Sequence, residues 1–279
     1  MYEVETHDMT PEFLECWKAA GIHISNQIQG GLQSWLKATP YPPFLEHLSF
    51  RLGNQNFYIR VTDVSGDIDG PGSERGLFAI ADGSNGHACF MPMRKKLFGG
   101  WVPDRAGWGL VDARTGRAVN PIDLVSDEKI EMSDWELQDF AVQVVRTQLE
   151  KEGFKLMSWQ GNPNVDPAIW FIGESRRPEW VVVRVSRDLE EEVVRPSNWK
   201  EIAAGCASTG KIGHFAPVTV FSADGLFDVE SDEPAPLYRG HAMQVVDTAR
   251  VMNLDFLFQE GCDFVVADNA DEAARGTDE

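Results

Sequence analysis

The chain has 279 residues, of which 43% are hydrophobic and 10% aromatic, a composition typical of a globular protein that excludes an intrinsically disordered one. Its formal net charge of −19, from 25 basic and 44 acidic residues, disfavours a protein that coats a nucleic-acid backbone. No apolar run approaches the roughly 20 residues of a membrane-spanning helix, and residues 1–5 lack the character of a signal peptide. We therefore expect a cytoplasmic protein of bacterial type with no membrane partner.

Cysteine usage predicts free thiols. The cysteines are widely scattered and include no Cys-x-x-Cys pair, so a zinc site or a disulfide framework has little support. Buried free thiols are expected at Cys16, Cys89, Cys206 and Cys262.

The first half of the chain predicts two helices, a β-hairpin, a short helix and a strand. These elements are expected at residues 10–20, 24–37, 48–52 with 57–61, 74–81 and 87–93. Thr10 and Pro11 are the capping residue and first-turn proline of a helix start, and Gly21 is expected to end or bend that helix. Residues 53–56 form the expected hairpin turn. Residues 94–96, the only dense basic run, are typical of a solvated turn.

The second half predicts a helix, three strands, a helix and a strand. They are expected at residues 133–152, 154–159, 168–172, 180–185, 198–206 and 214–221. Ser133 and Glu136 form a capping-box pattern at the start of the first of these helices, and its apolar stripe continues to Leu149.

The sequence of the first half resembles that of the second half, as in a diverged internal repeat. Arg60 and Arg184 each interrupt an apolar strand, and each precedes a glycine–histidine pair by a similar distance: His87 lies 27 residues after Arg60, and His214 lies 30 after Arg184. The aligned segments are 57–61 with 181–185, 76–81 with 199–204, and 86–88 with 213–215. This self-similarity predicts an internal duplication.

The fold expected from this pattern is α/β with mixed sheets, in two related αβββαβ-like lobes that form a pseudo-twofold pair. The expected divisions are an N-terminal lobe at 1–125, a C-terminal lobe at 126–267 and a mobile acidic tail at 268–279.

The αβββαβ order of residues 133–221 resembles the core of the restriction-endonuclease-like superfamily, the PD-(D/E)xK nucleases and their inactive relatives. The resemblance implies a divalent metal held by an aspartate at the second strand and by an acidic residue two positions before a lysine on the third. Asp166 fits the first position and Arg184 stands in the lysine place. Val182 stands where the second acid is required, and a valine cannot bind a metal. The nuclease centre is therefore expected to be absent or degraded.

If catalysis survives, the candidate residues are Asp166, Glu179 and Arg184, with Glu136 from the preceding helix. Glu179 lies at the start of the third strand, where its spacing from Arg184 puts the two side chains on different faces. The alternative for an arginine in an apolar strand is a pair with a buried carboxylate.

The candidate binding residues are Arg60, His87, Trp159 and His214. The two histidines could act as metal ligands or general bases. A structural role, in which each histidine hydrogen-bonds the loop between helix and strand, is favoured because neither has other metal-ligand residues near it in the sequence. Trp159 stands in a polar loop that suits base stacking or pocket lining, although packing is the commoner role. No dedicated metal site and no cofactor are expected, apart from a divalent metal if the protein is an enzyme.

These observations predict a non-catalytic, cytoplasmic protein-binding or regulatory module on a degraded nuclease-like scaffold, with a protein as its partner. One alternative is a metal-dependent nuclease or phosphoesterase that uses Asp166, Glu179 and Arg184. Another is an acidic DNA-mimic inhibitor, which rests on the charge of −19.

Overall fold

The computed structural model describes residues 10–32, 34–37, 47–68, 70, 72–188, 193–223, 225 and 234–245, and the backbone of 256–257 and 265–266. The chain divides into two compact units, Met1–Ser133 and Asp134–Glu279. The sequence-based boundary lies eight residues earlier, between 125 and 126. The expected tail at 268–279 lies outside the described residues.

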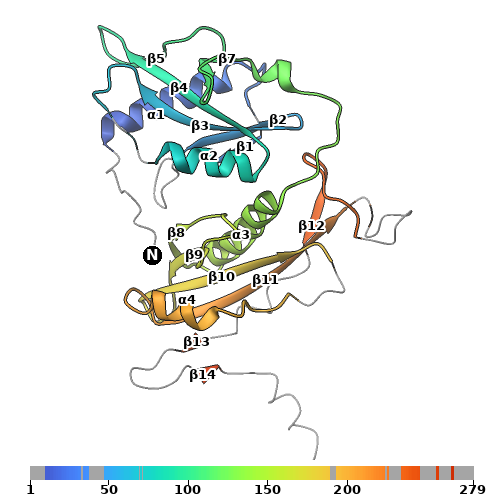
Figure 1. Ribbon diagram of the computed structural model, residues 1–279. Coiled ribbons are helices and arrows are strands. Elements are labelled where there is room, and N and C mark those ends of the chain that lie inside the picture. Colours follow the sequence, from blue (N-terminus) through green and yellow to red (C-terminus); the bar gives the residue numbers. More distant parts are fainter. Residues whose placement is uncertain are drawn as a thin grey trace, which may run out of the picture. The chain divides into compact units, whose positions relative to one another are not determined.

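Unit 1 contains a mixed sheet with a helix on each face (Figure 1). Its elements are α1 (Pro11–Ser25), β1 (Trp35–Lys37), β2 (Leu48–Leu52), β3 (Gln55–Asp63), α2 (Glu74–Gly83), β4 (His87–Lys95), β5 (Trp101–Pro103), β6 (Leu110–Asp112), β7 (Ala118–Val119) and a 3-10 turn at Pro121–Leu124. The strand order is β1-β2-β3-β4-β6-β7, with β5 also paired to β4. Only the β3–β4 pair is parallel among these described strands.

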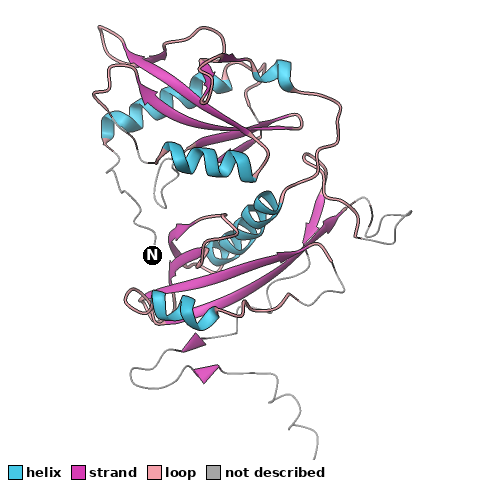
Figure 2. Ribbon diagram, in the orientation of Figure 1, coloured by secondary structure: helices cyan, strands magenta, loops and turns pink. Residues whose placement is uncertain are grey.

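Unit 2 repeats the arrangement (Figure 2). Its elements are α3 (Asp134–Lys151), β8 (Lys155–Trp159), β9 (Ile169–Ile172), β10 (Pro178–Ser186), α4 (Trp199–Cys206), β11 (Ile212–Ser222), β12 (Met243–Val245), β13 (Phe256–Leu257) and β14 (Val265–Val266). The strand order is β14-β13-β11-β10-β9-β8, with β12 paired to β11. The β10–β11 pair is parallel, as a strand–helix–strand connection requires.

The predicted mixed α/β fold is therefore confirmed, and both units begin with the order αβββαβ. The two parallel pairs also share their register. Phe57 stands opposite His87, and Val181 stands opposite His214. These are the residues that the sequence alignment of the two halves matched. The arrangement of the two units about a common axis stays a prediction.

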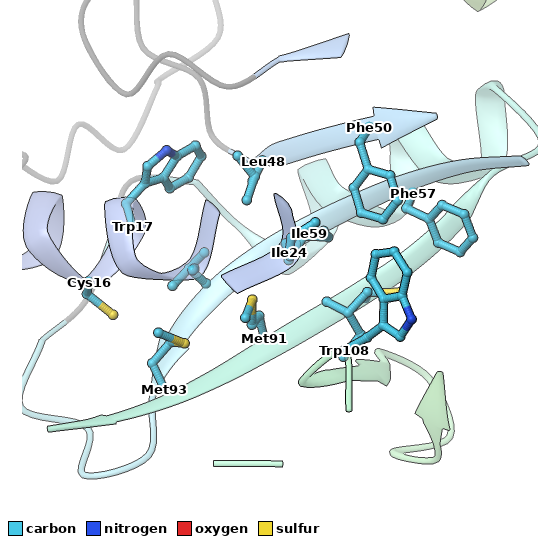
Figure 3. Close-up of a cluster of buried hydrophobic side chains, with 14 of the residues drawn as sticks. Cys16, Trp17, Ile24, Leu48, Phe50, Phe57, Ile59, Met91, Met93 and Trp108 are labelled. Carbon is cyan, nitrogen blue, oxygen red and sulfur yellow. The ribbon is translucent and has the colours of Figure 1, made fainter. Parts of the chain in front are cut away.

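In unit 1 the alternation of β3 puts its apolar side chains under α1. Ile59 lies beside Ile24 of this helix, in the same buried cluster as Trp17, whereas Phe57 lies farther along the sheet beside Phe50 and Trp108, as Figure 3 shows. The next residues along, such as Tyr58, point to the opposite face, where α2 packs on β3 and β4.

In unit 2 the same alternation divides β10 between two helices. Trp180 and Val182 pack against Ala203 and Cys206 of α4. Val181 and Val183 point to the other face, toward α3, and the Gln138 amide of α3 donates to the Val183 carbonyl at 3.0 Å. The residues that follow Glu179 on β10 are thus held in place by helices that pack on both faces of the sheet.

Two local predictions were wrong. The helix expected at 24–37 does not exist, because α1 runs through Gly21 to Ser25 and residues 35–37 form strand β1. Gly30 and Gly31 both have φ of +84°, a conformation that interrupts a helix. The hairpin turn is also shorter than expected, since β3 already begins at Gln55.

Three cysteines are buried free thiols, as predicted: Cys16, Cys89 and Cys206. Cys262 lies outside the described residues. Among the helices of the described residues, none combines the length and the hydropathy needed to cross a bilayer.

Candidate functional site

Arg184 of β10 and Asp166, which precedes β9, form a bidentate ion pair. Nη1 of Arg184 donates to Oδ1 of Asp166 at 2.9 Å, and Nη2 donates to Oδ2 at 2.5 Å. Nη1 also donates to the Val183 carbonyl at 2.8 Å. The pair is partly buried, with the side chains 27% and 14% exposed. Both carboxylate oxygens of Asp166 are thus engaged by the guanidinium that stands in the expected lysine place.

Glu179, the second residue of β10, belongs to a different cluster. Its Oε2 lies 2.8 Å from Nε2 of His214 on β11, and its Oε1 accepts from the Ser175 hydroxyl at 2.8 Å. The Ser175 amide also donates to Oε1, at 3.4 Å. Glu179 is 5% exposed and His214 8%. Because an ionised carboxylate can only accept, Nε2–H of His214 is the donor in this contact.

The backbone closes tightly around this carboxylate. A Cβ added to Gly173 would lie 1.9 Å from Cδ of Glu179, so only glycine leaves room for the buried acid. Phe171, which stands opposite Glu179 on β9, covers the histidine, with the two ring centroids 5.5 Å apart. The Glu179–His214 contact is therefore enclosed by the turn between β9 and β10 and by the sheet.

The two clusters lie on opposite faces of the sheet. His214 is in register with Val181 and shares the face of Glu179. Arg184 is an odd number of residues from Glu179 and points to the other face, as expected from the spacing. The structure thus brings Asp166 to Arg184 and Glu179 to His214, but it does not bring the three catalytic candidates together.

Unit 1 carries a matching pair at the equivalent positions. Nε2 of His87 lies 2.9 Å from Oε1 of Gln55, and the imidazole stacks on Phe57 with ring centroids 4.9 Å apart. Gln55 lies two residues before Phe57 on β3, as Glu179 lies two before Val181 on β10. Arg60 takes the place of Arg184 and is partly buried. The two units therefore share a histidine-to-side-chain contact, made with an amide in one and an acid in the other.

The remaining candidates have structural partners. Trp159 ends β8, and the Arg146 guanidinium of α3 lies 4.7 Å from its ring centroid, a cation–π contact. Glu136 of α3 accepts from Nε and Nη2 of Arg239 at 2.7 and 3.0 Å. The Arg239 side chain is 1% exposed, so this pair fixes the segment before β12 to α3.

Three residues of these contacts were not predicted from the sequence: Gln55, Ser175 and Arg239. A signal for Gln55 was present, because extending the alignment of 57–61 with 181–185 by two residues puts Gln55 on Glu179. No comparable signal identified Ser175 or Arg239, since their partners depend on how a turn and a late segment fold back.

The donor set does not fit the divalent metal that the nuclease resemblance implies. Asp166 is bound by a guanidinium, and Glu179 is bound by His214 and Ser175 on the other face. Across the described ranges, no group of three or more His, Cys, Asp or Glu residues is arranged to hold a metal ion.

Burial makes the three described thiols poor nucleophiles. Desolvation, aided by Asp63, Asp112 and Asp166 respectively, raises the pKa of each to about 12: Cys16, Cys89 and Cys206. Since the thiolate is the reactive form, these cysteines offer no catalytic nucleophile.

Comparisons with known proteins give one family. The search of curated proteins found no match, and the search of solved structures found none. The family model described as "Domain of unknown function (DUF8840)" matches residues 135–247, from the first turn of α3 to just beyond β12. Over this stretch of unit 2, which includes both clusters around β10, the chain is similar to that family.

Proposed function

We propose that this protein is a non-catalytic protein-binding or regulatory module whose two lobes derive from a degraded nuclease-like scaffold. The observation that carries the proposal is the pair of equivalent histidine contacts, His87 with Gln55 and His214 with Glu179. An amide cannot serve as a general base or bind a hard cation as a carboxylate does. Because the histidine makes this contact with an amide in one unit and with a carboxylate in the other, the contact stabilises the fold and does not serve acid–base chemistry.

The second cluster supports the same conclusion. A metal ion bound at Asp166 would have to compete with Arg184, whose guanidinium engages both carboxylate oxygens. Charge-assisted bidentate contacts of this kind are among the stronger hydrogen bonds in proteins. Asp166 and Arg184 therefore form a structural ion pair that links the loop before β9 to β10.

Charge indicates the chemistry of the partner. Residues 134–279 contain 27 acidic and 13 basic residues, whereas residues 1–133 contain 17 and 12. Most of the negative charge thus belongs to the second unit, and electrostatic complementarity favours a partner with a basic surface. We expect the association to weaken as ionic strength rises.

The test combines calorimetric titration of the whole chain with Mg²⁺ and Mn²⁺, cleavage assays on single- and double-stranded DNA, and purification of the complex from cells. We expect no cleavage and a protein partner that, once purified, binds again with salt-dependent affinity. Asp166→Ala, which removes the ion pair with Arg184, and Glu179→Gln, which preserves the histidine contact, serve as matched variants. Metal-dependent cleavage that is lost in Asp166→Ala would overturn the proposal in favour of a nuclease.

The two other functions make different predictions in the same experiments. A nuclease or phosphoesterase with a migrated carboxylate requires Glu179 and Asp166 to act together, although they lie on opposite faces of the sheet. A DNA-mimic inhibitor would bind a DNA-binding protein in competition with duplex DNA. Competition of the purified partner by duplex DNA would therefore distinguish mimicry from ordinary protein binding.

A further inference from the structure

The hairpin of β4 and β5 ends in the two most exposed large apolar side chains of the described residues. Leu97 is 98% exposed and Phe98 102%. The hairpin base is anchored in the core of unit 1, since Trp101 is buried and pairs with Lys95 across the two strands. The apolar tip is therefore held away from the body of the unit on a fixed stem.

The tip has a defined conformation. The Gly99 amide donates to the Lys96 carbonyl at 3.1 Å, and the Lys96 amide donates to the Gly100 carbonyl at 2.9 Å. Leu97 and Phe98 are the two central residues of this closed turn. Gly99 and Gly100 have φ of +88° and +79°, which side-chain-bearing residues rarely adopt. Because the turn is preformed, binding through it has little ordering cost.

Leucine and phenylalanine are the wrong residues for this position if the turn serves the fold alone. Central turn positions favour glycine, proline, asparagine, aspartate and serine. Leu97 and Phe98 gain no packing here, and each exposes apolar surface that water disfavours. Local rules broken without a compensating contact mark a functional site.

Cations surround the base of the tip. Arg94, Lys95 and Lys96 directly precede Leu97, and within the described part of the chain no carboxylate pairs with Lys96. Lys95 contacts Glu12, and Arg94 lies 3.8 Å from Asp104. Both of those cations stay more than half exposed, so they can exchange these partners for others.

The net charge of −19 does not prevent an anionic target from meeting this tip. Exposed charges more than about 10 Å apart are largely screened at physiological salt. An approaching surface therefore experiences mainly the charges at the hairpin itself, where Lys96 has no carboxylate partner among the residues that the structure describes.

The surroundings of the tip favour lipid over a protein pocket. A protein interface places its apolar anchors at the centre of a patch that buries about 800 Å² on each side. Leu97 and Phe98 instead follow three basic residues and precede two glycines, and both side chains are almost fully exposed. Insertion into a bilayer interface needs no flanking complementary surface, and it places cations at the depth of the lipid headgroups.

We propose that Leu97 and Phe98 insert into an anionic lipid surface, with Lys96 and its basic neighbours at the level of the headgroups. The attachment is peripheral and reversible and needs no membrane-spanning helix, and it departs from the sequence-based expectation that the protein has no membrane partner. It would bring the module, together with its protein partner, to the membrane surface.

The test is flotation of the whole chain with vesicles, either equimolar phosphatidylglycerol and phosphatidylcholine or phosphatidylcholine alone. We expect the protein to float with the anionic vesicles only. Leu97→Ser/Phe98→Ser should lower the partition coefficient at least tenfold, since each side chain loses its apolar transfer term. Lys96→Gln should lower it about fivefold. The matched control is Ile122→Ser/Leu124→Ser, which removes apolar side chains that are 54% and 39% exposed elsewhere in unit 1.

A second measurement locates the tip. Leu97→Cys can be labelled with a polarity-sensitive dye because the three described native thiols are buried, and the labelled wild-type chain corrects for any other thiol. A blue shift of the dye on anionic vesicles supports insertion. Failure of the wild type to bind these vesicles overturns the proposal and is the result that a protein pocket would give. Equal binding to neutral vesicles, or equal loss in the control variant, also overturns it.

Discussion

Replacing Glu179 tests whether the acid in unit 2 is needed for its charge or only for its shape. Glu179→Gln gives unit 2 the amide that unit 1 already has at Gln55. In that variant the amide oxygen can accept from Nε2–H of His214, and the amide nitrogen can donate to the Ser175 hydroxyl. Only the 3.4 Å contact from the Ser175 backbone amide is lost.

The magnitudes follow from these contacts. One weak hydrogen bond lost at a buried site costs about 1 kcal/mol. Glu179→Ala removes the acceptor of the His214 Nε2–H and of the Ser175 hydroxyl, at about 1–3 kcal/mol for each lost contact. We therefore expect Glu179→Ala to destabilise the protein by about 3 kcal/mol, and Glu179→Gln by about a third of that. Gln55→Glu in unit 1 is the reciprocal control.

The assay is urea unfolding followed by circular dichroism, with all variants measured in one buffer at neutral pH. The free energy of unfolding should fall in the order wild type, Glu179→Gln, Glu179→Ala. If the glutamine variant is as unstable as the alanine variant, the carboxylate charge itself is required. The equivalence of the two histidine contacts would then be refuted as evidence for a structural role.

Three further predictions concern other buried groups. Arg239→Met should lower the free energy of unfolding by about 3–5 kcal/mol, because it leaves Glu136 buried without this cation; Glu136→Gln/Arg239→Met should recover much of the loss in the same urea assay. Burial, and secondarily Lys37, lowers the pKa of His47 to about 3. Below about pH 6.5 the unfolded chain therefore binds a proton that the folded chain does not, and the free energy of unfolding decreases as the pH is lowered. His47→Phe should therefore lose about 2–3 kcal/mol less than the wild type between pH 7 and 4.5, measured by urea unfolding at both values. In native protein at pH 8, Ellman's reagent should react slowly with three thiols and quickly after unfolding, and fast native reaction would contradict their assigned burial: Cys16, Cys89 and Cys206.

The sequence predicted most of the fold because periodicity and turn chemistry are local. The strand around Val181 to Val185 and the helix from Asp134 are long and strongly patterned, and both are present. Residues 35–37 were misassigned because a three-residue edge strand has too few positions to show a period. Their apolar side chains fitted the stripe of a helix equally well.

The partners of the candidate residues were harder to predict. Arg184 meets Asp166 across 18 residues because the antiparallel pairing of β9 with β10 brings the residues just before β9 opposite the last part of β10. Glu179 meets His214 through the register of two parallel strands joined by α4. Sequence spacing gave the face on which each side chain lies, but the partner is set by register and loop geometry, which are properties of the folded chain.

Asn54, in the turn of the first hairpin, has a practical consequence for dissecting the chain. Its amide nitrogen donates to Oγ of Ser126 at 3.0 Å and to the Glu128 carbonyl at 2.8 Å, and its amide oxygen accepts from the Ser126 backbone at 3.2 Å. A fragment cut at residue 125 would remove these three contacts from a side chain that is 8% exposed. A fragment designed to express the first lobe alone should therefore extend at least to residue 128. A protease that cleaves between 129 and 133 should release a lobe that keeps the contacts of Asn54 with Ser126 and Glu128.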